Sequence, residues 1–534
     1  MSRALGGADR SAPLRDEAPV PATSSERRTR RRGRAGRAAW WAAFAVLSML
    51  GGLWAVADPV FSVPDEPAHV VYAAAIVRGE FFAPTEGIDT TVTVPRTYAD
   101  AHTAGACFIF DGAVPAGCAE PFVAQDGTAE VVTTAGRYPP AYYLYAGSAT
   151  LLADGATAIY LMRFLTVLLC AALLASAFSS ARETRSPWPV TGIVLACTPM
   201  VLFFTGAVNP QGPELAAGIG LWSAGLALLT TSADRSDSGR SRVPPRLVAR
   251  CVAAAAVLSV IRPLSIVWLG LIVLVVLLAR ATGPSVRELL RSRSLIAGGI
   301  GIGVLVAVSA VWIVYRDALR QWARPTDLEF ERAALFSVSK LDLELHEMVG
   351  VFGWLDNWAP GAVYILWFAA VGTLVALALA VGTRRERLAL ASIVLISLVV
   401  PVLSELSSYR ESAFAWQGRY ILAFSAGLVV LSGYVLVGTM PPVIAARVAR
   451  GLVVAAGVAH VVAFIGNLNR YVHGIHGFWF IDEPGWRPPL PAGLLILAFL
   501  VTIGVALFLL LRVLAERDAP EPDAFARGET VVLR

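Results

Sequence analysis

Long apolar runs alternate with short polar connections along most of the chain. A membrane-spanning helix needs about 20 apolar residues, and by that rule the pattern predicts about twelve spans. We expect them near residues 38–57, 158–180, 188–206, 212–231, 247–261, 263–280, 295–315, 361–382, 388–404, 419–438, 446–466 and 490–512. The two spans on either side of Arg262-Pro263 are short, which is typical of a broken pair. The pattern therefore predicts an all-α polytopic membrane protein.

The arginines between the apolar runs predict how the chain is oriented. Cytoplasmic loops carry an excess of Lys and Arg, and every short Arg-rich connection falls on one side if the N-terminus is cytoplasmic. Residues 139–153 would reverse this order if they crossed the membrane, so we expect them to form a helix against the outer surface. The expected parts are a disordered basic tail (1–37), a membrane domain (38–512) with long outer loops at 58–157, 316–360 and 467–489, and an inner C-terminal tail (513–534).

Composition agrees with this picture and excludes one class of function. Of the 534 residues, 56% are hydrophobic and only 16% are charged, against about a quarter charged in a soluble domain. The net charge of +5 comes from arginines scattered between apolar runs, so we expect no nucleic-acid partner. The basic tail does not lead into a small-residue cleavage site, so no signal peptide is predicted. We expect a plasma-membrane protein with both termini cytoplasmic and an extracytoplasmic active face.

Residues capable of chemistry collect in the outer loops. Five of the six histidines belong to them, namely His69, His102, His346, His473 and His476. Cys107 and Cys118 share the first outer loop, and an exterior compartment permits disulfides, so we predict that these two are bonded. No Cys-x-x-Cys spacing suggests a zinc site.

The hexapeptide Pro64-Asp65-Glu66-Pro67-Ala68-His69 follows the first apolar run directly. One interpretation is structural: Asp65 caps a short interfacial helix over residues 66–78, with Pro67 in its first turn and Gly79 at its end. The other is catalytic, because a carboxylate at a helix start beside lipid can act as a general base. Asp65 and His69 are four residues apart and would share one helix face. We expect Asp65, Glu66 and His69 to be the catalytic candidates.

Further candidates lie where outer loops meet spans. Arg419, Arg262 and Arg137 are candidate phosphate-binding residues, because a guanidinium pairs well with phosphate; snorkelling to the interface is the plain alternative. Five other residues are candidates for substrate binding: Tyr138, Tyr142, Asp356, Gln417 and Tyr420. Two tryptophans around Asp356 are also typical of an aromatic belt, and Arg137 begins a Pro-Pro turn. Glu214, at the start of a span, is a weaker site candidate.

Four of these motifs together carry a resemblance. They are Pro64 to His69, Pro139 to Tyr143, Gly350 to Asp356 and Gln417 to Tyr420. In order and spelling they resemble a bacterial family of integral membrane proteins known only as a domain of unknown function, over roughly residues 40–510. That family often has Asp after an Asn-Pro pair, where this chain has Gln211. The family in turn resembles the C-type fold of membrane glycosyltransferases.

The resemblance implies a polyprenyl-phosphate sugar as donor and an envelope glycan, lipid or protein as acceptor, with membrane lipid around them. Asp65 would accept the proton of the attacking hydroxyl, and Arg419, with Arg262 and Arg137 behind it, would stabilise the leaving phosphate. Glu66 and His69 would orient Asp65 or the acceptor. A single displacement would invert the anomeric centre. A divalent metal, Mg²⁺ or Mn²⁺, is compatible with the carboxylates, although no ligand set is evident.

Two other functions fit the sequence. A transporter or flippase for lipid-linked sugars would suit about twelve spans, but we find no convincing internal repeat or pair of discontinuous segments. A non-catalytic assembly protein of the envelope would also suit a polytopic chain. Transport without sugar transfer would favour the first alternative. Loss of complex formation after outer-loop changes, with Asp65 dispensable, would favour the second.

Overall fold

The computed structural model describes residues 24–237, 243–320, 326–412 and 414–515. Eight helices in this part are long and apolar enough to cross a membrane, and a ninth span arises if α5 (Pro187–Ala196) and α6 (Pro199–Thr205), bent by 65°, are counted as one. The eight long helices are α1 (Ser24–Ala57), α4 (Gly155–Ala181), α7 (Gln211–Asp237), α11 (Arg293–Tyr315), α14 (Gly361–Val381), α15 (Arg384–Ser412), α18 (Pro442–His473) and α19 (Ala492–Ala515).

Shorter helices account for the other predicted spans. They are α8 (Pro245–Val260), α9 (Ser265–Arg280), α16 (Leu422–Ser425) and α17 (Gly427–Val435). A helix of 16 residues, such as α8 or α9, is about 24 Å long, less than the roughly 30 Å of a hydrocarbon core. The all-α polytopic architecture is therefore confirmed, but twelve full-length spans are not.

The tail prediction needs one correction. The helix α1 begins at Ser24, so the chain is helical well before residue 38, where the disordered tail was expected to end. Arginine is a good helix former, and a basic run can simply extend the first membrane helix. Residues 1–23 and 516–534, which hold the rest of the two predicted tails, lie outside the described residues.

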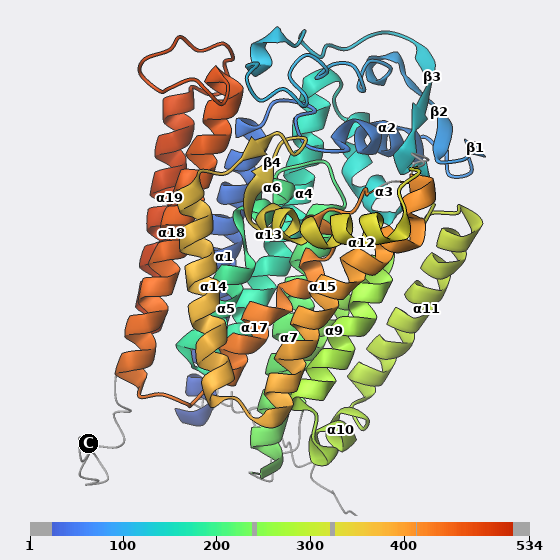
Figure 1. Cartoon of the computed structure of the whole chain (residues 1–534). Helices are drawn as coiled ribbons and strands as arrows, with labels where there is room; N and C mark the ends of the chain where they lie inside the picture. The colour runs from blue at the N-terminus through green and yellow to red at the C-terminus, as the bar shows by residue number, and fades with distance from the viewer. Residues whose placement is uncertain (1–23, 238–242, 321–325, 413, 516–534) are drawn as a thin grey trace, which may run out of the picture.

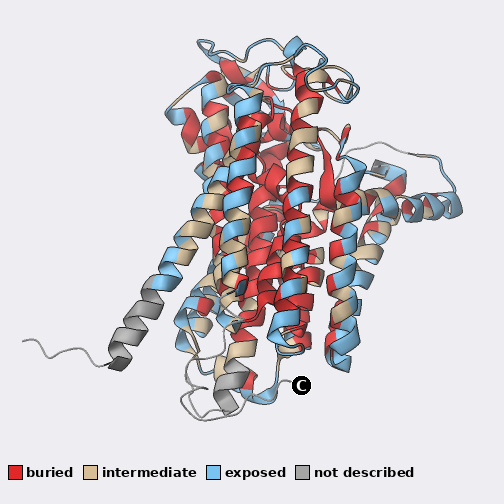
Figure 2. Ribbon diagram, turned by 90° about the vertical axis from the view of Figure 1, so that its left-hand side faces the viewer, coloured by how far each residue is buried: buried red, intermediate tan, exposed pale blue. Residues whose placement is uncertain are grey.

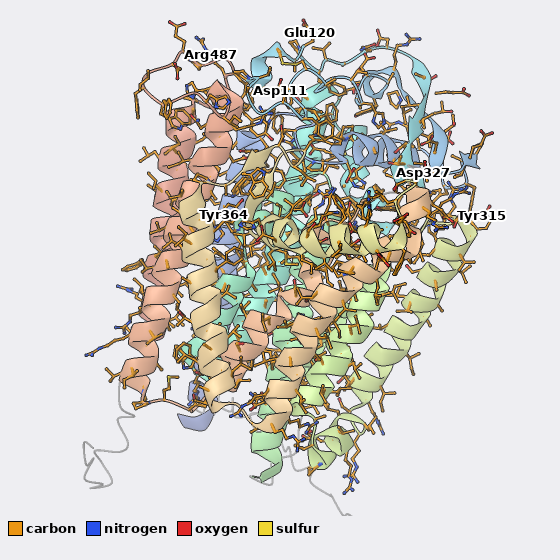
Figure 3. All side chains as sticks on the ribbon, viewed as in Figure 1. Asp111, Glu120, Tyr315, Asp327, Tyr364 and Arg487 are labelled. Carbon is orange, nitrogen blue, oxygen red and sulfur yellow. A yellow bond between two sulfur atoms is a disulfide. The ribbon has the colours of Figure 1, made fainter. Side chains whose placement is uncertain are left out.

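The connections gather at the two ends of the bundle. The first long loop, the horizontal helices α12 (Phe330–Ser339) and α13 (Leu341–Gly350), and the connection between α18 and α19 lie at one end in Figure 1. The helix α10 (Gly283–Leu289), in an Arg-rich connection, and the end of α19 lie at the other. Figure 3 places Asp111, Glu120 and Arg487 at the first end, which we call the loop end.

The first long loop folds on itself over the loop end. It contains α2 (Glu66–Ile76), α3 (Ala141–Gly147) and a three-stranded antiparallel sheet of β1 (Thr85–Glu86), β2 (Asp89–Pro95) and β3 (Thr128–Thr133). Alternate residues of β2 are buried, including Val92 and Val94, so this face covers the wholly buried α2. The sequence analysis did not predict the sheet. As expected, the segment after Pro139-Pro140 is a short helix, with seven residues.

Smaller elements complete the loop end. The strands β4 (Val351–Phe352) and β5 (Asn357–Trp358) pair across a turn before α14. Cys107 and Cys118 form the predicted disulfide. In the described residues, short 3-10 helices connect larger elements here and elsewhere in the bundle: η1 (Arg96–Tyr98), η2 (Ala116–Cys118), η3 (Thr134–Arg137), η4 (Ser148–Leu151), η5 (Arg182–Thr184) and η6 (Gly418–Tyr420).

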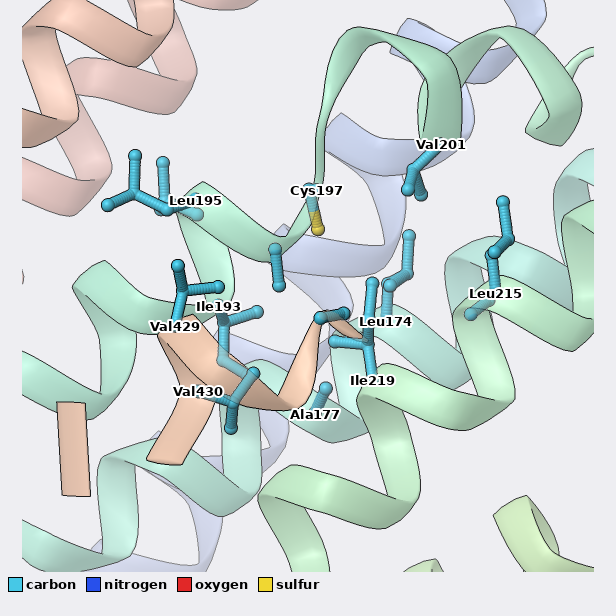
Figure 4. Close-up of a cluster of buried hydrophobic side chains, with 14 of the residues drawn as sticks. Leu174, Ala177, Ile193, Leu195, Cys197, Val201, Leu215, Ile219, Val429 and Val430 are labelled. Atoms are coloured by element: carbon cyan, nitrogen blue, oxygen red, sulfur yellow. The ribbon is translucent and has the colours of Figure 1, made fainter. Parts of the chain in front are cut away.

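The core of the bundle is apolar and closely packed. Figure 2 shows the buried residues concentrated along the inner helices, whereas the outward faces of the peripheral helices are exposed. Leu174, Ile193, Leu215 and Val430, drawn in Figure 4, belong to this core and come from α4, α5, α7 and α17. In α7, 83% of an apolar stretch of 18 residues is buried, against 11% of such a stretch in α11. The inner helices thus form a fixed scaffold beneath the loop end.

Candidate functional site

The carboxylate of Asp65 does not cap α2. Asp65 occupies the N-cap position with φ of 64°, in the left-handed region, and its side chain makes no capping hydrogen bond. Such a conformation costs a residue other than glycine about 1–3 kcal/mol, although Asp adopts it more readily than most residues. The side chain is 50% exposed. The structural interpretation of Asp65 as a helix cap is therefore wrong, and its carboxylate is directed elsewhere.

Asp65 faces a polar cavity of about 270 Å³ at the loop end. The segments that line it are far apart in the sequence: the start of α2, η3 and the residue after it, the approach to α7, the approach to α9, the connection after α11, one side of α15, and the segment around η6. Among the predicted site residues, the cavity brings together Asp65, His69, Arg137, Tyr138, Arg262 and Tyr420.

Arginines dominate the charge around this cavity. Arg262 forms an ion pair of 2.6 Å with the buried Glu214, and its guanidinium lies 5.4 Å from the centre of the Tyr420 ring. Arg137 donates from Nη1 to the carbonyl of Asp317 at 2.7 Å. Glu214 therefore fixes Arg262 in place and offsets its charge, whereas the recorded partner of Arg137 is an uncharged carbonyl. The carboxylates of Asp317 and Asp89 act on Arg137 only through space, so an anion entering the cavity could form a direct ion pair with it.

Arg419 lies beside Asp65 rather than in the cavity lining. Its Nη2 is 3.1 Å from Oδ2 of Asp65, and its guanidinium lies 5.0 Å from the centre of the Phe204 ring and 5.3 Å from that of Tyr420. The arginine side chain is 3% exposed. Because a desolvated charge needs a partner, Arg419 holds the Asp65 carboxylate at the cavity wall.

His69 is a buried, neutral member of the site. Its Nδ1 lies 2.9 Å from the hydroxyl of Tyr143. Burial lowers the pKa of His69 to about 3, and the nearby Arg262 and Arg419 act in the same direction while Asp65 opposes them. Burial also holds the pKa of Tyr143 well above its usual range, so the phenol keeps its proton. His69 can therefore exchange hydrogen bonds with a ligand but does not carry a proton as a cation at neutral pH.

Glu66 belongs to a buried network of contacts, and its orienting role stays a prediction. Its carboxylate is fully buried and pairs with Arg163 of α4 at 2.6 Å. It also accepts hydrogen bonds from the backbone N–H groups of Phe61 and Val208, both at 3.0 Å. These four groups tie the start of α2 to α4 and to the approach to α7. Glu66 touches neither the cavity nor Asp65, because successive residues at a helix start point in different directions.

Three further predicted substrate-binding residues lie away from the cavity. Asp356 forms a buried ion pair with Arg470 at 2.6 Å. The hydroxyl of Tyr142 lies 2.9 Å from that of Thr166 on α4, so the ring points into the bundle. Gln417 belongs to the segment before η6 and does not contribute to the cavity lining. Their roles in substrate binding stay predictions, and their positions show that nearness to a motif in the sequence does not fix the direction of a side chain.

The sequence analysis missed other residues of the site. Gln211 and Glu405 line the cavity, and the side-chain amide of Gln211 donates to the carbonyl of Arg419 at 2.7 Å. An Asp in place of Gln211 would lack that N–H donor. Lys340 binds Glu405 at 2.5 Å. The sequence does single out Lys340, because it is the only lysine of an arginine-rich chain. The sequence analysis did not consider it.

No metal site accompanies these groups in the described part of the chain. Within those residues, no cluster of three or more His, Cys, Asp or Glu side chains has a geometry suited to a metal ion. Arg137, Arg262 and Arg320 bring positive charge to the cavity lining. The Mg²⁺ or Mn²⁺ considered from the sequence stays a prediction.

A second cavity has a mostly apolar lining. It measures about 220 Å³, lies between α1, α4, α5, α18 and α19, and is lined almost wholly by apolar side chains. Its polar members are few, with Arg182 and His460 among them. A ligand there would be held by apolar contact, so the polar cavity at the loop end is the place for chemistry.

The fold and the cavity define a polytopic membrane protein with a polar, arginine-rich site at one end of its helix bundle. Comparison with known families gives a more specific result. Residues 47–428 match the family described as Predicted membrane protein (DUF2142), and the chain belongs to that family. The match is shorter than the 40–510 expected from the motifs, but it includes Asp65 and Arg419. No curated protein matches the chain.

Proposed function

We propose that this protein is a membrane glycosyltransferase that moves a sugar from a polyprenyl-phosphate donor to an envelope acceptor on the outer face of the plasma membrane. The observation that carries the proposal is the carboxylate of Asp65. It is released from helix capping, half exposed, and directed into a polar cavity that also contains arginines. A base beside an anion-binding surface is what this transfer needs.

The reaction follows from these groups. A hydroxyl of the acceptor attacks the anomeric carbon of the donor sugar while Asp65 accepts the hydroxyl proton. The new C–O bond forms as the bond between the anomeric carbon and the phosphate oxygen breaks, and polyprenyl phosphate leaves with the electron pair. Because one displacement occurs on one face of the sugar, the anomeric configuration inverts.

The three arginines have different roles in binding the donor. Arg137 faces the cavity with a carbonyl as its recorded partner, so it is the first candidate for the donor phosphate. Arg262 adds a fixed guanidinium, offset by Glu214. Arg419 contacts Asp65 directly and would both orient the base and stabilise negative charge that develops nearby. This order differs from the sequence analysis, which placed Arg419 first.

The aromatic rings suit a sugar. Tyr138 and Tyr420 both line the cavity, and their rings lie 6.0 and 5.4 Å from the guanidinium carbon of Arg262. Aromatic faces pack against the C–H groups of sugars, whereas the side-chain amides of Asn209 and Gln211 already bond to Pro64 and Arg419 and so hold the cavity wall in place. The cavity lies at the end of the bundle, beneath the first loop, where a donor with its lipid chain in the membrane can present its head group.

The experiment is a donor screen on the purified protein in lipid nanodiscs. Polyprenyl-phosphate sugars are offered one at a time with an envelope extract as acceptor, and release of polyprenyl phosphate is measured with heat-inactivated protein as the blank. We expect release with at least one donor. Movement of a lipid-linked sugar across proteoliposomes, with no release from any donor, would contradict the proposal and support a transporter.

A further inference from the structure

We infer that Lys340 and Glu347, on the helices that lie across the loop end, position the segment that carries Arg419 and so set the geometry of the Asp65–Arg419 pair. This inference rests on the proposed function because it assigns positioning residues to that site. Neither residue is a member of a sequence motif, and neither lines the cavity.

Each of the three hydrogens of the Lys340 ammonium group has an acceptor. It donates to Oε1 of Glu405 at 2.5 Å and to the carbonyls of Phe414 and Trp416, each at 3.0 Å. A lysine ammonium has three hydrogens and no acceptor, so three acceptors exhaust it. Two of them belong to the backbone just before η6. Lys340 thus fastens this segment to α15 through Glu405 and to the junction of α12 and α13, where the lysine itself lies.

Glu347 and a glycine bring the same segment against α13. Oε2 of Glu347 accepts a hydrogen bond from the backbone N–H of Gly418 at 2.5 Å. A Cβ atom at Gly418 would lie 1.9 Å from the carbonyl oxygen of Glu344, so only glycine allows this approach. The residue that follows is Arg419. From the other side, Gln211 holds the Arg419 carbonyl, and the guanidinium reaches Asp65.

Three carboxyl groups surround Lys340. Glu344, Glu347 and Glu405 all lie close to it, and Glu347 also lies near Arg419. Among the described residues, neither carboxylate oxygen of Glu344 has a hydrogen-bond partner, although both are buried. Burial raises the pKa of Glu344 to about 8, so Glu344 is the group that keeps the proton.

Two substitutions test the inference by different routes. Lys340→Met removes the three hydrogen bonds and leaves Glu405 without its cation. Gly418→Ala changes no charge but pushes the segment away from α13. Gly361→Ala is the matched control, since a Cβ there meets nothing within 4 Å. If Lys340→Met fails to fold, Gly418→Ala still carries the test.

Hydrogen–deuterium exchange gives a result that does not depend on enzymatic activity. We expect exchange in residues 414–420 to rise at least about tenfold in both variants, with α14 and α18 unchanged and the control like the wild type. We also expect kcat for sugar transfer to fall about 100-fold, since a displacement of about 1 Å can have that effect, with KM for the donor nearly unchanged.

The outcomes separate this inference from the proposed function. Unchanged exchange in residues 414–420 in both variants would overturn the inference, whatever the transfer assay shows. Raised exchange with full transfer activity would also overturn it, because the segment would then be held but would not set the site. Absence of transfer by the wild type would count against the proposed function alone, and the exchange result would still decide whether Lys340 positions the segment.

Discussion

Asp65 and Glu66 are neighbours in the sequence, yet their carboxylates have opposite surroundings. Asp65 is half exposed and faces a cavity, whereas Glu66 is fully buried against Arg163. A sequence that contains two adjacent acids does not say which one is turned inward. The first turn of α2 decides it, because Asp65 adopts a left-handed conformation that directs its side chain away from the helix.

The environment of Glu66 predicts a loss of stability. Removing one partner of a buried ion pair costs about 3–5 kcal/mol, since the other charge is left unpaired. We therefore expect Glu66→Gln to lower the midpoint of thermal unfolding much more than Asp65→Asn does, as measured in the same detergent. Equal midpoints for the two variants would contradict the structural role of Glu66.

The environment of His69 predicts that the stability of the fold decreases at low pH. Its pKa is about 3 in the fold, against about 6.5 in an unfolded chain. Between these values the unfolded state binds the proton and the folded state does not, so stability falls as the pH is lowered below about 6.5. We expect His69→Gln to weaken this fall in melting temperature between pH 7 and pH 5. An unchanged slope would show that His69 is not held neutral.

At the scale of elements, α13 is the part that a hydropathy pattern describes least well. It is short, lies across the bundle (Figure 1), and buries Glu344 and Glu347. A pattern of polar residues in an outer loop suggests exposure to water, but these carboxylates serve as internal contacts to Lys340 and to the segment around η6. That arrangement depends on partners more than 60 residues away, which no local pattern contains.

The pKa of Glu344 predicts how the stability of the fold changes as the pH rises. Its pKa is about 8 in the fold and about 4.3 in an unfolded chain, and its neighbours are Lys340, Glu347 and Glu405. The folded state therefore holds an extra proton across this window, so stability is greatest at the acid end and falls as the pH rises towards 8. We expect Glu344→Gln to flatten the fall in melting temperature between pH 5 and pH 8. An identical slope in variant and wild type would contradict this assignment.

The elements also show where sequence reasoning succeeded. Apolar runs of about 20 residues predicted the long helices, because the membrane sets their length. Pro139 and Pro140 predicted a short helix that does not cross. The cap at Asp65 was the wrong interpretation, since capping requires an extended backbone at the N-cap and the residue is left-handed there. Backbone conformation at a single residue is not visible in a hydropathy pattern.

At the scale of the whole molecule, a rigid bundle carries a site built from distant segments. Asp65, Arg137, Arg262 and Tyr420 span more than 350 residues of sequence and line one cavity. Their shared position at the loop end could be predicted, because the sequence places each of them in or beside an expected outer loop. The assignment of Tyr142 and Asp356 to the same site could not be decided, because their partners Thr166 and Arg470 become visible only in the fold.

The proposed sugar transfer depends on Asp65 acting as a base. The most direct test compares wild type, Asp65→Asn and Asp126→Asn in lipid nanodiscs, with the donor found by the screen at saturation and thermal melts as the check on folding. Asp126 is an exposed carboxylate in the same loop that does not line the cavity. We expect the Asp65→Asn protein to lose at least about 100-fold in the rate of transfer and the Asp126→Asn protein to match the wild type. A folded Asp65→Asn protein that transfers sugar at the wild-type rate would contradict the central claim.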